Sequence, residues 1–155
     1  MGRNKYPEET VAKILDAALE LFCAQGYEGT SIQDIVDRLD GMTKGAVYHH
    51  FKSKEEIFNA AFDRAMAPIV ERRRATLGAG NMTGAQKLKR LYAPESVVPQ
   101  IELWARMHPA SDPVKSSRLL AMQYQGSFDE SADGYLLSVI EEGIADGSIA
   151  CACPR

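Results

Sequence analysis

Residues 30–58, TSIQDIVDRLDGMTKGAVYHHFKSKEEIF, contain the pattern that decides the fold. Apolar residues recur there at helical spacing and predict a helix over residues 31–39, with Thr30 as its N-cap. A turn that contains Gly41 separates this helix from a second short helix, predicted over residues 44–50. Two short helices joined by such a turn form a helix-turn-helix arrangement.

The second short helix is predicted to have an inner and an outer face. Val47 and Phe51 are four residues apart and point inward together. Small residues on the outer face let the backbone approach a DNA duplex, and tyrosine and histidine can bond phosphates or base edges. Lysines at 44, 52 and 54 make this segment basic in a chain of formal net charge −3. The outward or flanking positions are Lys44, Gly45, Ala46, Tyr48, His49 and His50.

Helical periodicity continues on both sides of this segment, and no run alternates for long enough to form a strand. An all-α fold is therefore expected. The first helix covers residues 8–25 and stops at Gly26. A long helix runs from Lys54 to about Leu77, and Pro68 is expected to kink or split it. Four further helices are predicted: after a Thr83–Gln86 capping box, from Pro94, from Pro113, and from Tyr135 to Ile144 with Gly147 closing it.

The composition is that of an ordinary globular protein, with 45% apolar and 25% charged residues. No run approaches the ~20 apolar residues that a membrane span needs, and the N-terminus lacks the apolar core of a secretory signal. A cytoplasmic protein without a membrane partner is expected. The odd number of cysteines argues against a disulfide framework, and Cys23 is expected to be a partly buried small hydrophobe.

The residues do not indicate an enzyme, a cofactor or a metal site. No nucleophile–base pair or glycine-rich phosphate loop is present. His49 and His50 are adjacent on a helix, so their side chains point ~100° apart and cannot chelate one metal ion together. The C-x-C of Cys151 and Cys153 has no further ligand at a suitable spacing.

The combined motifs resemble a known family. T-K-G at residues 43–45, Y-H-H-F at 48–51 and K-S-K-E-E at 52–56 are similar to the signature of TetR-family repressors, as is T-S-I-Q-D-I at 30–35. The resemblance covers about residues 8–62.

This resemblance implies two domains. The first, residues 1–62, is a three-helix DNA-binding domain with its helix-turn-helix at about 31–50 and its third helix in the major groove. The second, residues 63–155, is a helical effector-binding and dimerisation domain. The phosphate contacts of the family carry over to Thr30, Tyr48, His50 and Lys54. Its groove contacts carry over to Thr43, Lys44, Gly45 and His49, with Ala46 near the bases.

Two features of the second domain are open to alternative interpretations. Aromatic and methionine side chains either line an effector cavity or simply pack in the core. The run Arg72–Arg74 is either a solvated helix face or a second DNA patch. The candidate effector residues are Phe62, Met66, Trp104, Met107, Met122, Tyr124 and Phe128.

The expected function is a transcriptional repressor that binds a palindromic double-stranded DNA operator as a homodimer. A small apolar effector would release it from the operator. Family members usually continue for further helices, which form the dimer interface. The alternative is therefore a truncated fragment with an intact DNA-reading head but impaired dimerisation.

Overall fold

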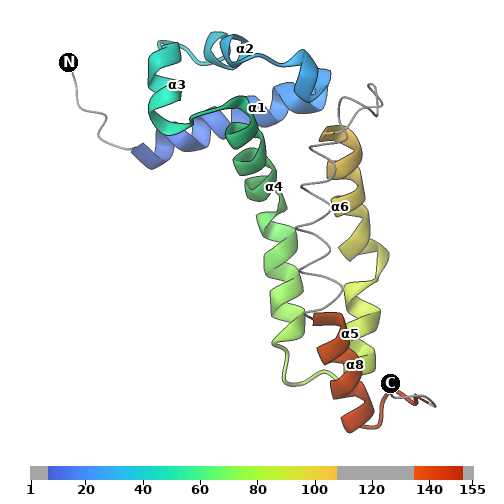
Figure 1. Cartoon of the computed structure of the whole chain (residues 1–155). Helices are drawn as coiled ribbons and strands as arrows, with labels where there is room; N and C mark the ends of the chain where they lie inside the picture. The colour runs from blue at the N-terminus through green and yellow to red at the C-terminus, as the bar shows by residue number, and fades with distance from the viewer. Residues whose placement is uncertain (1–6, 108–134, 152–155) are drawn as a thin grey trace. The chain divides into compact units, whose positions relative to one another are not determined.

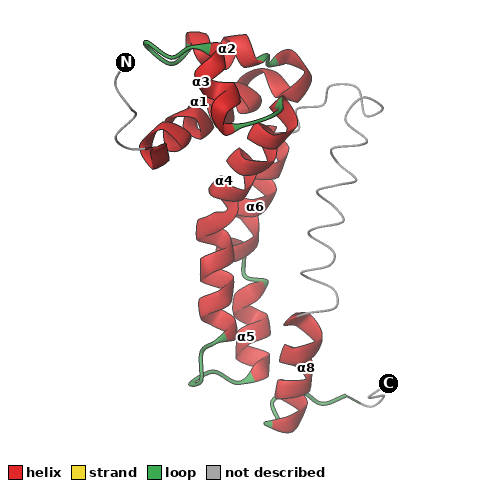
Figure 2. Cartoon of the chain, turned by 60° about the vertical axis from the view of Figure 1, so that its left-hand side comes forward, coloured by secondary structure: helices red, strands yellow, loops and turns green. Residues whose placement is uncertain are grey.

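A computed structural model of the chain describes residues 7–107 and 135–151 (Figure 1). Every regular element in these two ranges is a helix, as Figure 2 shows, and the predicted all-α class is confirmed. None of the helices in the described part of the chain is long and apolar enough to cross a membrane.

The chain divides into two compact units. Among the described residues, the first comprises 7–67 with 102–107, and the second comprises 68–101 with 135–151. The first unit contains three whole helices, the beginning of a fourth, and the end of α6, whose bounds are given below. The first four are α1 (Pro7–Gly29), α2 (Ile32–Asp37), α3 (Lys44–His50) and α4 (Lys54–Leu77).

Helices α1 and α3 follow the sequence prediction closely. The bounds of α3 are the predicted ones, with Thr43 as its N-cap. Gly26 has a left-handed backbone, φ 75°, inside the span of α1. This break is the predicted stop at Gly26, after which about one more helical turn follows.

The start of α2 differs from the prediction, because Ser31 and not Thr30 is its N-cap. Ser31 Oγ accepts a hydrogen bond of 3.1 Å from Asp34 N, and Asp34 Oδ2 accepts one of 2.7 Å from Ser31 N. Thr30 is buried instead, and its hydroxyl donates to Gly26 O at 2.8 Å. The predicted Thr30 cap is therefore wrong, and α2 is shorter than predicted at both ends.

An aromatic cluster forms the centre of the first unit. The rings of Phe22 and Phe58 meet edge to face with their centroids 5.0 Å apart, and the ring of Tyr27 lies 5.2 Å from that of Phe58. Phe22 and Phe58 are fully buried. This cluster joins α1 to α4, and Val47 adds the inner face of α3 to the same buried core.

The second unit contains the end of α4, together with α5, α8 and the start of α6. Their bounds are α5 (Gly84–Leu91), α6 (Pro94–Met107) and α8 (Leu136–Ala145). The Thr83–Gln86 capping box of α5 is confirmed. Pro68 lies inside α4 and does not split it. The helix predicted from Pro113 lies outside the described residues.

Helices α5 and α8 pack side by side (Figures 1 and 2) and cross at two buried glycines. A Cβ atom on Gly84 would overlap Gly143 N and Cα, and it would lie 2.6 Å from Val139 O. The two backbones therefore touch directly. Only glycine at position 84 allows the backbones of α5 and α8 to approach this closely.

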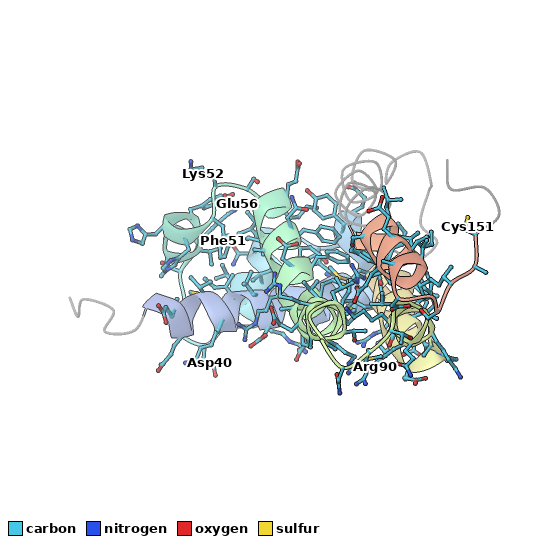
Figure 3. The ribbon with its side chains drawn as sticks, turned by 90° about the horizontal axis from the view of Figure 1, so that it is seen from below. Asp40, Phe51, Lys52, Glu56, Arg90 and Cys151 are labelled. Carbon is cyan, nitrogen blue, oxygen red and sulfur yellow. The ribbon has the colours of Figure 1, made fainter. Side chains whose placement is uncertain are left out.

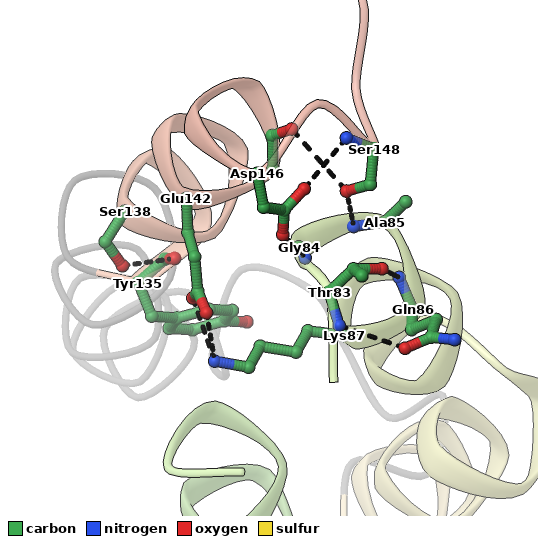
Figure 4. Close-up of polar contacts among 11 residues, drawn as sticks. Thr83, Gly84, Ala85, Gln86, Lys87, Tyr135, Ser138, Glu142, Asp146 and Ser148 are labelled. Atoms are coloured by element: carbon green, nitrogen blue, oxygen red, sulfur yellow. Dashed lines mark hydrogen bonds and ion pairs between the residues drawn. The ribbon is translucent and has the colours of Figure 1, made fainter. Parts of the chain in front are cut away.

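Polar contacts fix the ends of the same helices, as Figure 4 shows. Asp146 Oδ2 accepts a hydrogen bond of 2.8 Å from Gly84 N, and Ser148 Oγ accepts one of 3.1 Å from Ala85 N. The end of α8 thus caps the start of α5. Lys87 Nζ, which is buried, donates to both carboxylate oxygens of Glu142 at 2.7 and 2.8 Å.

The Asp146 cap predicts acid sensitivity of the second unit. Hydrogen bonds from the Ser148 side chain and from Gly84 N hold the pKa of Asp146 below its ordinary value of 3.8. A carboxylate with a lowered folded-state pKa stabilises the fold above its unfolded pKa, and this contribution disappears as the pH falls through the folded-state value. Asp146→Asn should therefore lower the melting temperature at neutral pH and reduce its dependence on pH below about pH 4.

Thermal melts between about pH 6 and pH 3 measure this effect. Glu141→Gln is the control, because Glu141 is an exposed carboxylate on the same helix. Equal pH profiles for the two variants would contradict the cap.

Candidate nucleic-acid interface

Helix α3 presents one face to solvent and buries the other. Val47 is fully buried and Phe51 is 7% exposed, whereas Tyr48 is 47% exposed. Figure 3 shows Phe51 between the helices and Lys52 pointing away from them. The predicted inner and outer faces are confirmed. The exposed candidates are Thr43, Lys44, Gly45, Tyr48 and His49, and Ala46 and His50 are half-buried.

The turn before α3 sets where this face begins. Gly41 has a φ of 74°, a left-handed conformation that suits glycine. Thr43 Oγ1 then accepts a hydrogen bond of 3.2 Å from Ala46 N and caps the helix. The first exposed residue, Lys44, is thereby held at the start of α3.

The start of α4 is capped in a similar way. Ser53 Oγ accepts from Glu56 N at 3.1 Å, and Glu56 Oε2 accepts from Lys52 N at 2.6 Å. The ring of Phe51 is buried beneath this junction. The Lys52 side chain is exposed and adds positive charge beside α3.

Lys54 has a structural role that its sequence pattern did not indicate. Its Nζ donates to Tyr27 O at 2.8 Å and to Thr30 O at 2.9 Å, and it lies 4.1 Å from the centre of the Tyr27 ring. These bonds join the end of α1 to the start of α4. An ammonium group has three N–H donors, and the two hydrogen bonds use two of them.

Thr30 does not lie on this face. Its side chain is 1% exposed, and its hydroxyl donates to Gly26 O. The hydroxyl is therefore not available to a phosphate in this structure, and we leave Thr30 out of the candidate interface. Its carbonyl contributes indirectly by accepting from Lys54.

The candidate effector residues are placed as follows. Phe62, Met66, Trp104 and Met107 belong to the first unit, and Met66 and Met107 are buried. A cavity of about 250 Å³ lies within the second unit and is lined by other residues. Three further candidates, Met122, Tyr124 and Phe128, lie outside the described residues.

Gly45→Ala tests whether the exposed glycine at position 45 matters for the stability of the free protein or for close approach to DNA. A Cβ at this position would meet only Thr43 Oγ1, at 3.9 Å, so the free protein has room for it. We expect the variant to fold with unchanged or slightly raised stability, by up to about 1 kcal/mol, because alanine favours a helix. If the backbone at Gly45 approaches DNA, the added methyl group should weaken binding at least about tenfold.

Chemical denaturation and DNA titration of the same preparation measure both effects. Gly80→Ala is the matched control, because a Cβ at Gly80 would meet nothing within 4 Å and the residue lies in the second unit. A Gly45→Ala variant with normal DNA affinity would show that the backbone at Gly45 does not approach the duplex.

Comparison with known proteins identifies the region that contains this face. Residues 14–61 match the family model described as bacterial regulatory proteins, tetR family. The HTH-type transcriptional regulator SrpR of Pseudomonas putida is 44% identical over 62 residues, which are 40% of this chain and 29% of that protein. The chain thus matches less than a third of the length of this relative.

Solved structures extend the likeness to the rest of the fold. A putative transcriptional regulator from Pseudomonas aeruginosa PAO1 has a TM-score of 0.70 at 19% identity, over 94% of this chain and 70% of that one. The TetR family transcriptional regulator PfmR from Thermus thermophilus has a TM-score of 0.60 at 27% identity, over 91% of this chain and 75% of that one. Both of these proteins are named as transcriptional regulators.

Proposed function

We propose that the chain is a transcriptional repressor that binds a DNA operator through α3. The proposal is supported by the match of residues 14–61 to the family model described as bacterial regulatory proteins, tetR family. The single observation that carries this proposal is the solvent-facing surface of α3. Lys44, Gly45, Tyr48 and His49 are exposed there above a buried Val47. Such a face fits the major groove, where a helix can read base edges.

The proposed contacts have two kinds of role. Lys44, Gly45, His49 and the Thr43 hydroxyl contact the groove, with Ala46 near the bases. Tyr48, His50 and Lys54 contact phosphates. Phosphate contacts set the position of the helix, and base contacts set the sequence that it recognises.

The regulator acts as a homodimer on a palindromic operator. Two copies of α3 reach two half-sites about 34–36 Å apart, or a multiple of that distance. A small-molecule effector in the second domain changes the spacing of the two heads and so lowers operator affinity. Size-exclusion chromatography of the chain tests the dimer, and a monomer at operator-binding concentrations would contradict it.

Selection from a random DNA pool tests the repressor proposal. The full chain should enrich a palindromic motif and bind it about 10³-fold or more tightly than a scrambled duplex at physiological salt. His49→Ala should relax the sequence preference while retaining non-specific binding. Affinity that is equal for all duplexes at every protein concentration would overturn the proposal.

Lys44→Met and Lys54→Met are expected to have the same effect on salt dependence and different effects on stability. Each variant loses one lysine charge at the DNA interface. The slope of the logarithm of the DNA-binding constant against the logarithm of the salt concentration should therefore become shallower by about 1. Only Lys54→Met also removes the bonds to Tyr27 O and Thr30 O. It should therefore destabilise the first unit by about 1–3 kcal/mol.

DNA titrations at four salt concentrations and urea denaturation measure the two quantities. Lys89→Met is the control, because Lys89 is exposed on α5 in the second unit. A normal salt slope in Lys54→Met would show that Lys54 only positions the helices and makes no phosphate contact.

A further inference from the structure

The cavity of about 250 Å³ in the second unit has an unusual combination of walls. Ile69, Leu91 and Val97 contribute apolar surface, and two consecutive arginines, Arg72 and Arg73, contribute positive charge. None of the residues that line the cavity is acidic. Its size is slightly below the range of about 300–1,000 Å³ for drug-sized ligands, which favours a small molecule.

Arg73 is held in place by neutral groups. Its Nη2 donates to Gln100 Oε1 at 3.2 Å, and its guanidinium lies 5.2 Å from the centre of the Tyr135 ring. These contacts orient the side chain without neutralising its charge. Among the described residues, no carboxylate forms an ion pair with Arg73.

Arg72 lies at the exposed edge of the same cavity. Its Nη1 donates to Glu95 O at 2.9 Å, a backbone carbonyl at the start of α6. The next residue in the run, Arg74, does not line the cavity, and it pairs with the carboxylate of Glu71. Two of the three arginines therefore line the cavity, and the third is a solvated surface residue.

We propose that this cavity binds a small amphipathic carboxylate. The carboxylate accepts hydrogen bonds from the guanidinium groups of Arg72 and Arg73, which present fixed N–H donors to a planar anion. The ring or short chain of the ligand packs against Ile69, Leu91 and Val97. The inference rests on the proposed function, because it makes this molecule the effector, and it replaces a purely apolar effector with an anionic one.

The test compares 3-phenylpropanoate with its neutral amide, 3-phenylpropanamide, by calorimetric titration of the full chain. The two probes have the same ring and chain and differ in charge. The carboxylate should bind at least about tenfold more tightly than the amide. Arg73→Gln should abolish this preference, and Arg74→Gln should retain it because Arg74 does not line the cavity.

Equal binding of the two probes, or an equal loss of preference in both variants, would overturn the proposal. Failure of binding by both probes would overturn it as well. Operator affinity without ligand, measured on the same preparation, separates this result from failure of the proposed function. If the chain forms a specific operator complex but shows no preference for the carboxylate probe, only the cavity proposal is contradicted. If it prefers the carboxylate probe but binds no operator specifically, the repressor proposal is contradicted and carboxylate binding by the cavity stands.

Discussion

Phe58→Ala is expected to destabilise the first unit by about 3–5 kcal/mol and to abolish operator binding. Phe58 is fully buried and its ring contacts those of Phe22 and Tyr27. Alanine would leave a cavity at the junction of α1 and α4. A loss of this size is a large fraction of the roughly 5–15 kcal/mol that stabilises a typical domain.

Fluorescence of Trp104 during urea denaturation measures this effect. It is the only tryptophan in the chain, and it belongs to the first unit. Tyr48→Ala is the matched control, since Tyr48 is exposed on α3. We expect this variant to lose DNA affinity at nearly normal stability, whereas a change below about 1 kcal/mol in Phe58→Ala would contradict the aromatic core.

Helix α3 could be predicted from the sequence because its signals are local. Thr43 caps it, and Val47 and Phe51 define its buried side within a few residues. The N-cap of α2 was harder to predict. Thr30–Gln33 and Ser31–Asp34 both have the spacing of a capping box. The Thr30 hydroxyl donates to Gly26 O instead of capping α2, so Ser31 is the N-cap.

The role of Lys54 could not be predicted, because its acceptors are backbone carbonyls more than twenty residues earlier in the chain. A motif shows a cation at this position and does not show what the cation contacts. The same limit applies to the arginine run. Arg72 and Arg73 differ from Arg74 only through α6 and Tyr135, which pack against them from distant parts of the sequence.

Gly84→Ala is the second substitution with a large expected effect. Helix propensity alone would predict that it stabilises the protein, whereas the packing of α5 against α8 predicts that it destabilises it. Alanine in a helix is normally more stable than glycine by about 0.5–1 kcal/mol. At Gly84, however, the new Cβ would overlap the backbone of Gly143, which cannot rotate away as a side chain can. The two helices must separate, and we expect a loss of about 1–3 kcal/mol.

Gly80→Ala is the control for this prediction, because a Cβ at Gly80 would meet nothing within 4 Å. Calorimetric melting should show a lower transition temperature in Gly84→Ala and no decrease in Gly80→Ala. Displacement of α8 also moves Tyr135, which directly precedes it and contacts Arg73. The carboxylate preference should therefore weaken in Gly84→Ala, and equal melting of the two variants would contradict the direct backbone contact between α5 and α8.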